Sequence, residues 1–404
     1  MAEGATQFAA SPRIDCRMPA EWEPHESTWL AWPHHRDDWP GKFEPIPWVY
    51  AEIIRHLSRH ERVDLIVNDA ASEKQARKVL ERANTFSENI RFHRWPTDRV
   101  WTRDSGCTFV KRGAGAAARE NRGGHDSSRA RNDASFTFSS RAKRDRSLAN
   151  DTAQSVFSTE PYNLLAIKWR FNAWAKYPNF QRDKKIGSRM AHATHAREVR
   201  PLFGKQRVVL EGGSFDVNGE GTLLTTEECL LGKVQERNPS MRREDYEKVF
   251  ADYLGVKRVI WLNSGILGDD THGHVDDISR FVAPETIVTM VESDPSDPNY
   301  KPLRENIRRL RSATDQDGKP LAIIELPMPS PVLFEGRRLP ASYANFYIAN
   351  GLVLVPVFND PNDRIALNTL TEFFPAREVI GIYSGDLIWG FGAMHCMTQQ
   401  QPRV

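Results

Sequence analysis

The sequence predicts an α/β fold, and three observations support that prediction. Between residues 47 and 96, segments with apolar residues at helical spacing alternate with short strand-like runs, in the order helix, strand, helix, strand. From residue 164 onward, a rhythm of strand, loop, strand, helix and strand recurs several times without any repeat of residue identity. The 404 residues are 40% hydrophobic, which is enough apolar material for one large domain or two ordinary ones.

Each element of the first third has its own local signal. The segment 47–60 carries apolar residues at helical spacing and has Pro47 near its first turn. The run VDLIVN at 63–68 is short and apolar, as expected of a strand. The segment 71–85 is amphipathic and is expected to be helical, whereas 90–96 alternates in polarity and indicates an extended segment.

The second half contains further strand-like runs and two helices. One helix is expected over 240–255, with Ser240 as its N-cap and Gly255 as its C-cap. A second is expected over 302–313. The strand-like runs lie at 208–210, 222–225, 257–262 and 286–290.

Between these halves the pattern breaks. Residues 113–151 are rich in Ala, Ser, Arg and Asn and carry almost no periodic apolar residues. We expect a disordered insert or long surface loop at about 113–160, inside a single domain that spans residues 1–404. The basic run RAKRDR at 141–146 is compatible with contact to nucleic acid, but a solvated charge run is the more ordinary interpretation.

Composition and charge argue against several classes of protein. The net charge of +2 creates no field directed at nucleic acid or a membrane. The apolar runs stay well below the ~18 residues that span a bilayer, and the first residues show no secretion signal. Cys16, Cys107, Cys229 and Cys396 lack the spacing of a disulfide scaffold or a zinc ribbon. We therefore expect a cytoplasmic protein with reduced thiols and neither nucleic-acid nor membrane partners.

Four places combine reactive side chains with turn-forming glycines or with the end of the sequence. Asp104 lies in WTRDSG, and Glu211 precedes two glycines in LEGGSF. His274 and Asp276 lie in GDDTHGHVDD, and Cys396 lies in HCMTQQQP. Each has an ordinary alternative when taken alone: a strand-end Asp is usually a turn or cap residue, EGG is usually a turn, and a single Cys is usually an inert buried thiol.

The HGHVDD segment also suggests a metal-dependent hydrolase. The spacing His272-x-His274-x-Asp276 resembles the H-x-H-x-D motif of the metallo-β-lactamase-type enzymes. A dinuclear site of that kind needs further histidines downstream, but after Asp277 the sequence has only His395. The sequence therefore offers too few ligands for such a metal site, and we expect no metal.

The other interpretation combines the four places in one site. Three carboxylates around one thiol disfavour an anionic substrate and favour a cation. A guanidinium is planar, permanently charged and able to donate hydrogen bonds to two carboxylates at once. Carboxylates that fix its plane and localise its charge leave a thiolate free to attack the central carbon.

Several segments together resemble those of the agmatine deiminases, a group related to the bacterial-type peptidyl-arginine deiminases within the guanidino-group-modifying superfamily. They occur in the family's order and span nearly the whole sequence after the first fifteen residues, apart from the insert. The resemblance implies a five-bladed, pseudo-symmetric β/α propeller, the pentein fold, built of ββαβ modules around a central site. The segments are RMPAEWEPHESTWLAWP, WTRDSG, EGGSFDVNGEGTLLTTEECLL, NPS, GDDTHGHVDDISRFV, SYANFYIANG and HCMTQQQP.

The resemblance also implies a role for each reactive residue. Cys396 resembles the nucleophile, which forms an amidino-thioether that water then hydrolyses. His274 resembles the general acid and base, and Glu211 resembles the acid that holds it and also reaches the substrate. Asp104 and Asp276 resemble the carboxylates that clamp the guanidinium. No metal or organic cofactor is implied.

The expected partner is a small guanidinium compound, agmatine, although free or peptidyl arginine stays open as an alternative. Trp101 is a candidate for packing on the aliphatic linker of the substrate. A non-enzymatic relative on the same scaffold is a further alternative, which the retention of all five reactive residues argues against. Relatives often form homodimers or larger assemblies, so a homo-oligomer is an open expectation.

The sequence departs from the family pattern in three ways. Cys107 stands where the family usually has proline, a change expected to loosen the loop that carries Asp104 slightly. The approach to the nucleophile, GFGAMHC, is less rich in glycine than is usual. The basic insert at about 113–160 has no residue with an assigned catalytic role.

Overall fold

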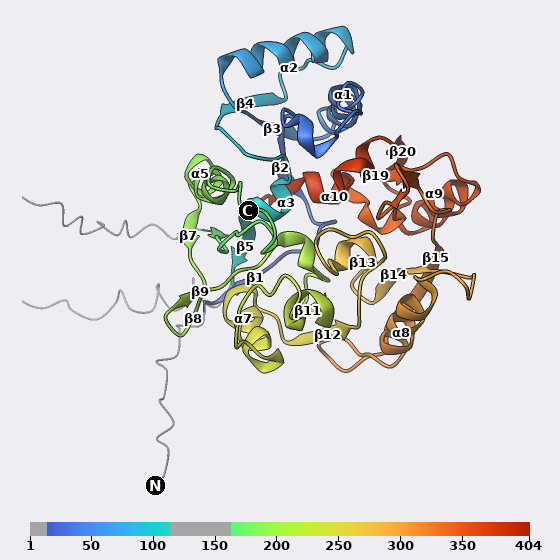
Figure 1. The fold of residues 1–404 in the computed structure, drawn as a ribbon. Helices are drawn as coiled ribbons and strands as arrows, with labels where there is room; N and C mark the ends of the chain where they lie inside the picture. The colour runs from blue at the N-terminus through green and yellow to red at the C-terminus, as the bar shows by residue number, and fades with distance from the viewer. Residues whose placement is uncertain (1–13, 114–162) are drawn as a thin grey trace, which may run out of the picture.

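The computed structural model describes residues 14–113 and 163–404, and it is a mixed α/β structure, as predicted (Figure 1). The insert expected at about 113–160 lies outside the described residues, apart from Gly113. The longer helices lie at the periphery, and the short helices α3 (Thr102–Ser105) and α10 (Met394–Met397) lie near the centre. No helix among the described residues is both long and apolar enough to cross a membrane.

Three sheets share one pattern of connection. Two consecutive strands pair antiparallel, a helix follows, and the next strand returns parallel to the second. The first is β10 (Phe215–Val217), β11 (Thr222–Thr226), α7 (Arg243–Leu254) and β12 (Arg258–Leu262), with the short α6 (Glu227–Leu231) after β11. The second is β13 (Ser279–Ala283), β14 (Thr286–Val291), α8 (Tyr300–Arg311) and β15 (Ala322–Pro327). The third is β18 (Tyr347–Ala349), β19 (Leu352–Val357), α9 (Pro361–Phe373) and β20 (Glu378–Tyr383).

Two larger sheets contain the same unit with one added strand. In one, β21 (Gln399–Pro402) pairs with β2 (His25–Ala31), and β3 (Arg62–Val67) and β4 (Ile90–Arg94) follow in parallel, with α1 (Ile46–Leu57) and α2 (Ala70–Arg82) in between. The other contains β5 (Thr108–Arg112), β6 (Leu164–Ile167), α5 (Ile186–Ala193) and β7 (Arg197–Val199), with β1 (Cys16–Arg17) at its edge. Two small hairpins complete the described strands: β8 (Leu202–Phe203) with β9 (Gln206–Arg207), and β16 (Leu333–Phe334) with β17 (Arg337–Arg338).

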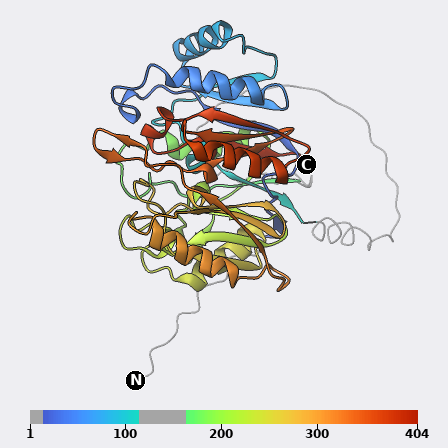
Figure 2. The same cartoon turned by 90° about the vertical axis from the view of Figure 1, so that its right-hand side faces the viewer.

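A short helical turn precedes the first strand of each of these five sheets. The turns α3 and α10 precede β5 and β21, and three 3-10 turns precede β10, β13 and β18. These turns contact one another, and Figure 1 shows α3 and α10 near the centre of the molecule, so residues far apart in the sequence are brought together there. Figure 2 shows the same fold turned by 90°. The three 3-10 turns are η3 (Gly212–Ser214), η4 (Val275–Asp277) and η5 (Tyr343–Asn345); the others are η1 (Arg36–Asp38), η2 (Asp183–Lys185) and η6 (Leu387–Gly390).

Local sequence explains several element ends. Asp69 caps α2 by accepting a hydrogen bond from the Ser72 amide at 2.8 Å, and Gly255 ends α7 in the left-handed region at φ +74°. Two sequence-based expectations are wrong. Ser240 does not cap α7, which begins at Arg243, because Ser240 adopts φ +73° in the preceding turn. The run 208–210 forms no strand and contributes only one isolated bridge.

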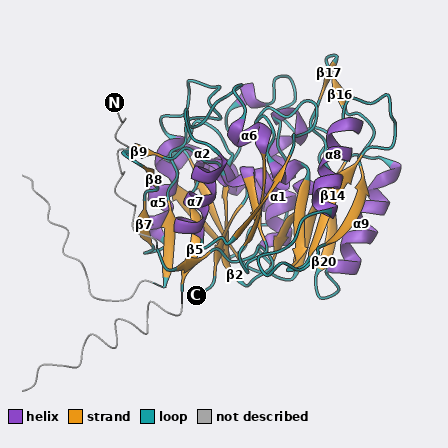
Figure 3. Ribbon diagram, turned by 90° about the horizontal axis from the view of Figure 1, so that it is seen from below, coloured by secondary structure: helices purple, strands orange, loops and turns teal. Residues whose placement is uncertain are grey.

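The interior combines apolar layers with a charged centre. The apolar layers lie between the helices and the strands. In Figure 3 the strands occupy the middle of the molecule. Trp29, Trp39 and Tyr50 are among the largest buried side chains, yet Arg280 is equally buried. A buried guanidinium needs carboxylate partners. The centre is therefore polar, and it is where the predicted site residues lie.

Candidate active site

A pocket leads from the surface to Cys396. Its lining runs from exposed Asp37 to buried Asp104 and Cys396, with Trp101 and Trp174 among its walls. The thiol-bearing side chain is only 4% exposed, so a substrate must enter the pocket to reach it. Trp101 packs directly on Gly392, where an added Cβ would lie 2.7 Å from the indole ring. Glycine at this position therefore lets the tryptophan come close to α10, although the segment has fewer glycines than the family usually has.

Asn345, in η5, positions the thiol. Its side-chain oxygen accepts hydrogen bonds from the backbone amides of Ala393 and His395, at 3.2 and 3.1 Å. Its amide nitrogen donates to Cys396 Sγ at 3.1 Å and to Asp277 Oδ1 at 2.9 Å. One side chain thus fixes α10 and places a donor on the sulfur, where it favours the thiolate.

The surroundings of the thiol nevertheless favour its protonated form. Burial raises the pKa of Cys396 well above its ordinary value, and Asp276, Asp277 and Asp104 raise it further. Cys396 Sγ lies 3.6 Å from Asp276 Oδ2, which can accept the thiol proton. A cation bound between these carboxylates and the sulfur would lower this pKa.

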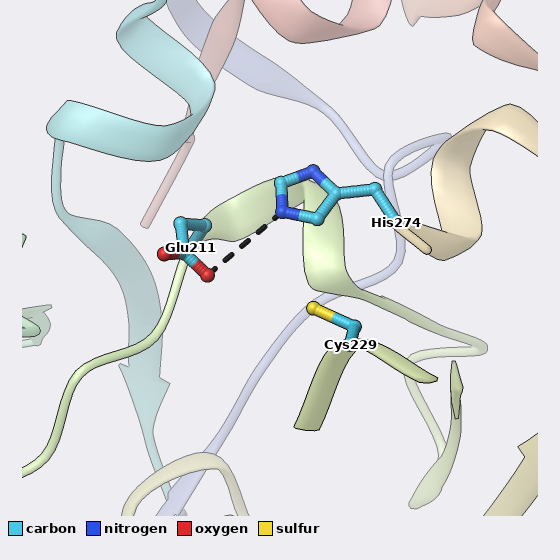
Figure 4. Close-up of side chains that lie close together, drawn as sticks. All are labelled: Glu211, Cys229 and His274. Carbon is cyan, nitrogen blue, oxygen red and sulfur yellow. Dashed lines mark ion pairs between the residues drawn. The ribbon is translucent and has the colours of Figure 1, made fainter. Parts of the chain in front are cut away.

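His274, just ahead of η4, lies among carboxylates. Its Nε2 is 3.8 Å from Glu211 Oε2, an approach drawn in Figure 4, and its Nδ1 is 3.9 Å from both Asp104 and Asp276. Burial lowers the pKa of His274, but Asp104, Glu211 and Cys229 outweigh that effect and hold it well above its ordinary value. The imidazole is therefore protonated at neutral pH and can donate a proton.

Asp104 and Asp276 are held by different partners. Asp104 accepts hydrogen bonds from the Gly213 amide at 2.9 Å and the Trp174 indole at 2.8 Å. Trp174 lies in a left-handed run, 173–175, with φ between +53° and +57°, which is rare for residues other than glycine. Asp276 Oδ2 lies 2.7 Å from His395 Nδ1, while its Oδ1 has no hydrogen-bond partner.

Glu211 pairs with a buried arginine. Both Glu211 oxygens lie 3.4 Å from Arg237 Nε, and neither side chain is exposed. Burial raises the pKa of Glu211, but Arg237 and His274 outweigh it, so the carboxyl stays ionised. Glu211, Cys229 and His274 are close enough together to hold a metal ion, as Figure 4 shows. The adjacent guanidinium and the protonated imidazole oppose a second cation there.

The residues of the alternative H-x-H-x-D metal motif do not converge on one point. His272 adopts φ +65° and its ring lies 3.7 Å from Glu228, whereas His274 and Asp276 lie in the central site. Neither of the two residue groups in the described chain that could hold a metal includes His272. The structure brings the predicted residues together, because Cys396, Asp104 and Trp101 line one pocket. Asp276 approaches Cys396, His274 approaches Asp104, and Glu211 approaches His274.

Glu21 is the residue of the centre that sequence analysis missed most completely. Its Oε1 accepts from Arg280 and from the Ile348 amide, both at 2.9 Å. Its Oε2 lies 3.2 Å from Arg103 Nη2 and 2.9 Å from His395 Nε2. Glu21 therefore supports His395, which in turn supports Asp276.

Asn345, His395 and Trp174 were also missed as site residues. Glu21, Asn345 and His395 occur within the family-like segments, in PAEWEP, SYANFY and HCMTQQ, so their positions were visible without their contacts. Trp174 lies outside those segments. Only the left-handed backbone of 173–175 explains how its indole reaches Asp104.

Comparisons with known proteins give a consistent result. Residues 17–402 match the model of the Porphyromonas-type peptidyl-arginine deiminase family. The agmatine deiminase of Pseudomonas aeruginosa (strain LESB58) is 32% identical over 417 residues, covering 97% of each chain. That of Ectopseudomonas mendocina (strain ymp) is 32% identical over 421 residues, covering 98% of each. The solved agmatine deiminase of Enterococcus faecalis superposes with a TM-score of 0.78 at 27% identity, covering 97% of this chain and 100% of that one.

Proposed function

The chain belongs to the Porphyromonas-type peptidyl-arginine deiminase family, and we propose that it hydrolyses agmatine to N-carbamoylputrescine and ammonia. The observation that carries this proposal is a set of buried polar atoms near the thiol that have no hydrogen-bond partner. Asp276 Oδ1 and both nitrogens of His274 are buried without hydrogen-bond partners beside Cys396. A planar guanidinium would satisfy that acceptor and would neutralise the surrounding carboxylates.

The charge of the pocket favours agmatine over arginine. Four carboxylates belong to its described lining, and the single guanidinium among the lining residues, Arg99, is paired with Asp38. The far end of agmatine is an ammonium, whereas arginine would bring a carboxylate into this negative field. The lining carboxylates are Asp37, Asp38, Asp104 and Asp270.

In the proposed first step, the sulfur of Cys396 attacks the guanidinium carbon. Asp104 and Asp276 hold the plane of the cation, and its charge lowers the pKa of the thiol. His274 donates a proton to the departing nitrogen. The C–N bond breaks, ammonia leaves and an amidino-thioether stays on the sulfur.

In the second step, water replaces the sulfur. His274, now neutral, takes a proton from the water, whose oxygen attacks the same carbon. The C–S bond breaks, the hydroxyl proton of the adduct passes to the departing sulfur, which recovers as the thiol, and the product carries the ureido group. Glu211 keeps the imidazole oriented through both proton transfers. No oxidant, reductant or metal takes part in this balance.

Three wider features belong to the same proposal. The five ββαβ units close into a five-bladed propeller, a proposal supported by the contacts of their five preceding turns with one another. The chain forms a single catalytic domain, with the insert at about 113–160 outside the machinery. The enzyme works in the cytoplasm on a small guanidinium compound, without nucleic-acid or membrane partners.

The direct test is ammonia release from agmatine, arginine and a blocked arginyl peptide, each in the presence of EDTA. We expect ammonia from agmatine, no effect of EDTA, and complete loss in Cys396→Ser. Cys16→Ser is the matched control, because it replaces another buried thiol that hydrogen-bonds to Tyr253 and does not line the pocket. Turnover of arginine equal to that of agmatine would contradict the assignment of agmatine as the substrate. Loss of activity in EDTA would favour a metal-dependent site.

A further inference from the structure

A second cavity, lined by basic residues, lies beside α5 and is not explained by the deiminase chemistry. We call it the basic cleft. Its described lining contains no carboxylate, and its walls include Trp169 and Phe180. Six cationic side chains line it: Lys168, Arg170, Lys184, Lys185, Arg200 and Arg207.

Most of this positive charge is uncompensated. Arg200 pairs with Glu198 at 2.5 Å, whereas none of the other five cations forms an ion pair within residues 14–113 and 163–404. Glu198 attracts both Lys168 and Arg207, and Asp183 attracts Lys168, but these two carboxylates are fewer than the six cations. The cations therefore still repel one another, which costs stability in the absence of a ligand. A cluster of this kind is typical of a site for a multiply charged anion.

Two of the cations are held in place by backbone carbonyls, and one of them, Lys168, is buried. Lys168 is only 4% exposed and donates a hydrogen bond to the Ser105 carbonyl at 3.2 Å. Arg207 donates to the Lys168 carbonyl at 2.7 Å, yet its buried Nε has no hydrogen-bond partner. Burial lowers the pKa of Lys168 to about 8, despite the opposing effect of Cys107. An anion would satisfy the free donor and stabilise the ammonium.

The start of α5 adds a helix N-terminus to the basic cleft. Lys184 and Lys185 immediately precede this eight-residue helix, and no side chain caps its first turn. Ser188, in that turn, also lines the basic cleft. The partial positive charge of a helix N-terminus favours phosphate oxygens.

We propose that the basic cleft binds a small molecule that carries linked phosphate groups. Six cations exceed what a single carboxylate needs, and two of them, Lys184 and Lys185, immediately precede α5, whose N-terminal partial positive charge favours phosphate oxygens. The site lies close to the catalytic machinery, because Lys168 holds the residue that follows Asp104. Phe171, another wall of the cleft, packs edge-on against Trp174 with ring centres 5.4 Å apart. The proposal does not depend on the deiminase activity.

The test is calorimetric titration of the full chain with pyrophosphate in EDTA, at low and at physiological salt. We expect one site per chain, and binding at least about tenfold weaker in Lys184→Gln/Lys185→Gln. These lysines are exposed, so the fold is not at risk. Arg170→Gln gives a second exposed variant with the same expected direction. The matched control, Lys257→Gln/Lys301→Gln, removes two exposed positive charges elsewhere and should leave binding unchanged.

Absence of heat with millimolar pyrophosphate would overturn the proposal, and so would equal weakening in the variant and the control. Inorganic phosphate should bind more weakly than pyrophosphate because it engages fewer of the cations. Titration with ATP identifies the source of the phosphates. If ATP binds more tightly than pyrophosphate, the ligand is a nucleotide. If ATP and pyrophosphate bind equally, the ligand is a free polyphosphate. Either result supports the proposal.

Discussion

At the residue scale, the ionisation of Cys396 governs the pH dependence of activity. Burial and three carboxylates raise the thiol pKa in the free protein, so the sulfur is protonated at neutral pH and the thiolate forms as pH rises. We expect no thiolate absorbance at neutral pH in the difference between the native protein and Cys396→Ser. The pH profile of kcat/KM reports the thiol pKa of the free enzyme, and that of kcat reports the thiol pKa of the enzyme–substrate complex. We expect the second pKa to be lower, because the bound guanidinium stabilises the thiolate.

The other thiols provide an internal control for this experiment. Cys107 is buried, does not line the pocket, and has its pKa raised to about 12 by burial, so it should resist alkylation whether or not substrate is present. Mass spectrometry of the alkylated peptides separates the two signals. A strong thiolate signal from Cys396 at neutral pH, without substrate, would contradict the dependence on substrate.

Asn345 is the second residue whose removal gives a specific result. Asn345→Asp keeps the acceptor that fixes α10 but replaces the donor that contacts the sulfur. We expect kcat to fall by about a hundredfold, as for loss of one preorganised donor, with KM changed much less. The alkaline limb for alkylation of Cys396 should also move to higher pH. A fall in kcat with an unchanged alkylation profile would mean that Asn345 acts only through the position of α10.

The predictability of the site also differs from residue to residue. Cys396, His274, Glu211, Asp104 and Asp276 were found because each lies in a short motif with a reactive group and a nearby turn or chain end. Glu21 and Asn345 resemble ordinary loop residues in the sequence. Their importance comes from contacts with residues more than 50 positions away, which no local pattern encodes.

At the element scale, β21 connects the last residues of the sequence to the centre. It pairs antiparallel with β2, and Gln400 accepts a hydrogen bond from Arg103 at 2.6 Å. Deletion of residues 399–404 should abolish activity and lower the melting temperature, since it removes a buried strand and leaves a buried guanidinium without this acceptor. The control removes Val404 alone, which is 64% exposed, and should retain activity. Full activity after the longer deletion would contradict the role of β21.

Helices and long strands could be predicted, because burial on one side imposes a periodic pattern over many residues. The helix expected at 71–85 is observed at Ala70–Arg82, and the strand expected at 63–68 is observed at Arg62–Val67. The short turns that carry the site could not be predicted, since three or four residues contain no periodicity. The run 208–210 has a strand-like composition, but the side chain of Asn238 occupies its backbone groups. The Asn238 side-chain oxygen accepts a hydrogen bond from the Val209 amide, and the Asn238 side-chain nitrogen donates one to the Val209 carbonyl.

At the scale of the whole molecule, Glu21 links the elements that surround the pocket. Its carboxylate contacts Arg103 in α3, Arg280 in β13, Ile348 in β18 and His395 in α10. Burial raises the pKa of Glu21, but Arg280, His395 and Arg103 outweigh it and hold the pKa well below its ordinary value. The ionised carboxylate therefore stabilises the fold most fully above the pKa of an unfolded glutamate, about 4.3.

Glu21→Gln should destabilise the protein by about 3–5 kcal/mol at neutral pH, the usual cost of removing one partner from a buried ionic network. The wild-type protein loses its advantage as pH falls through the depressed pKa of Glu21, so the two unfolding curves should converge in acid. Denaturant midpoints measured at neutral pH and at about pH 3 test both parts of this expectation. The matched control is Glu285→Gln, whose carboxylate pairs with Lys319 at the surface and should change stability by less than about 1 kcal/mol. A difference between wild type and Glu21→Gln that stays constant with pH would mean that Glu21 acts through shape and hydrogen bonding, and that its charge does not hold the centre together.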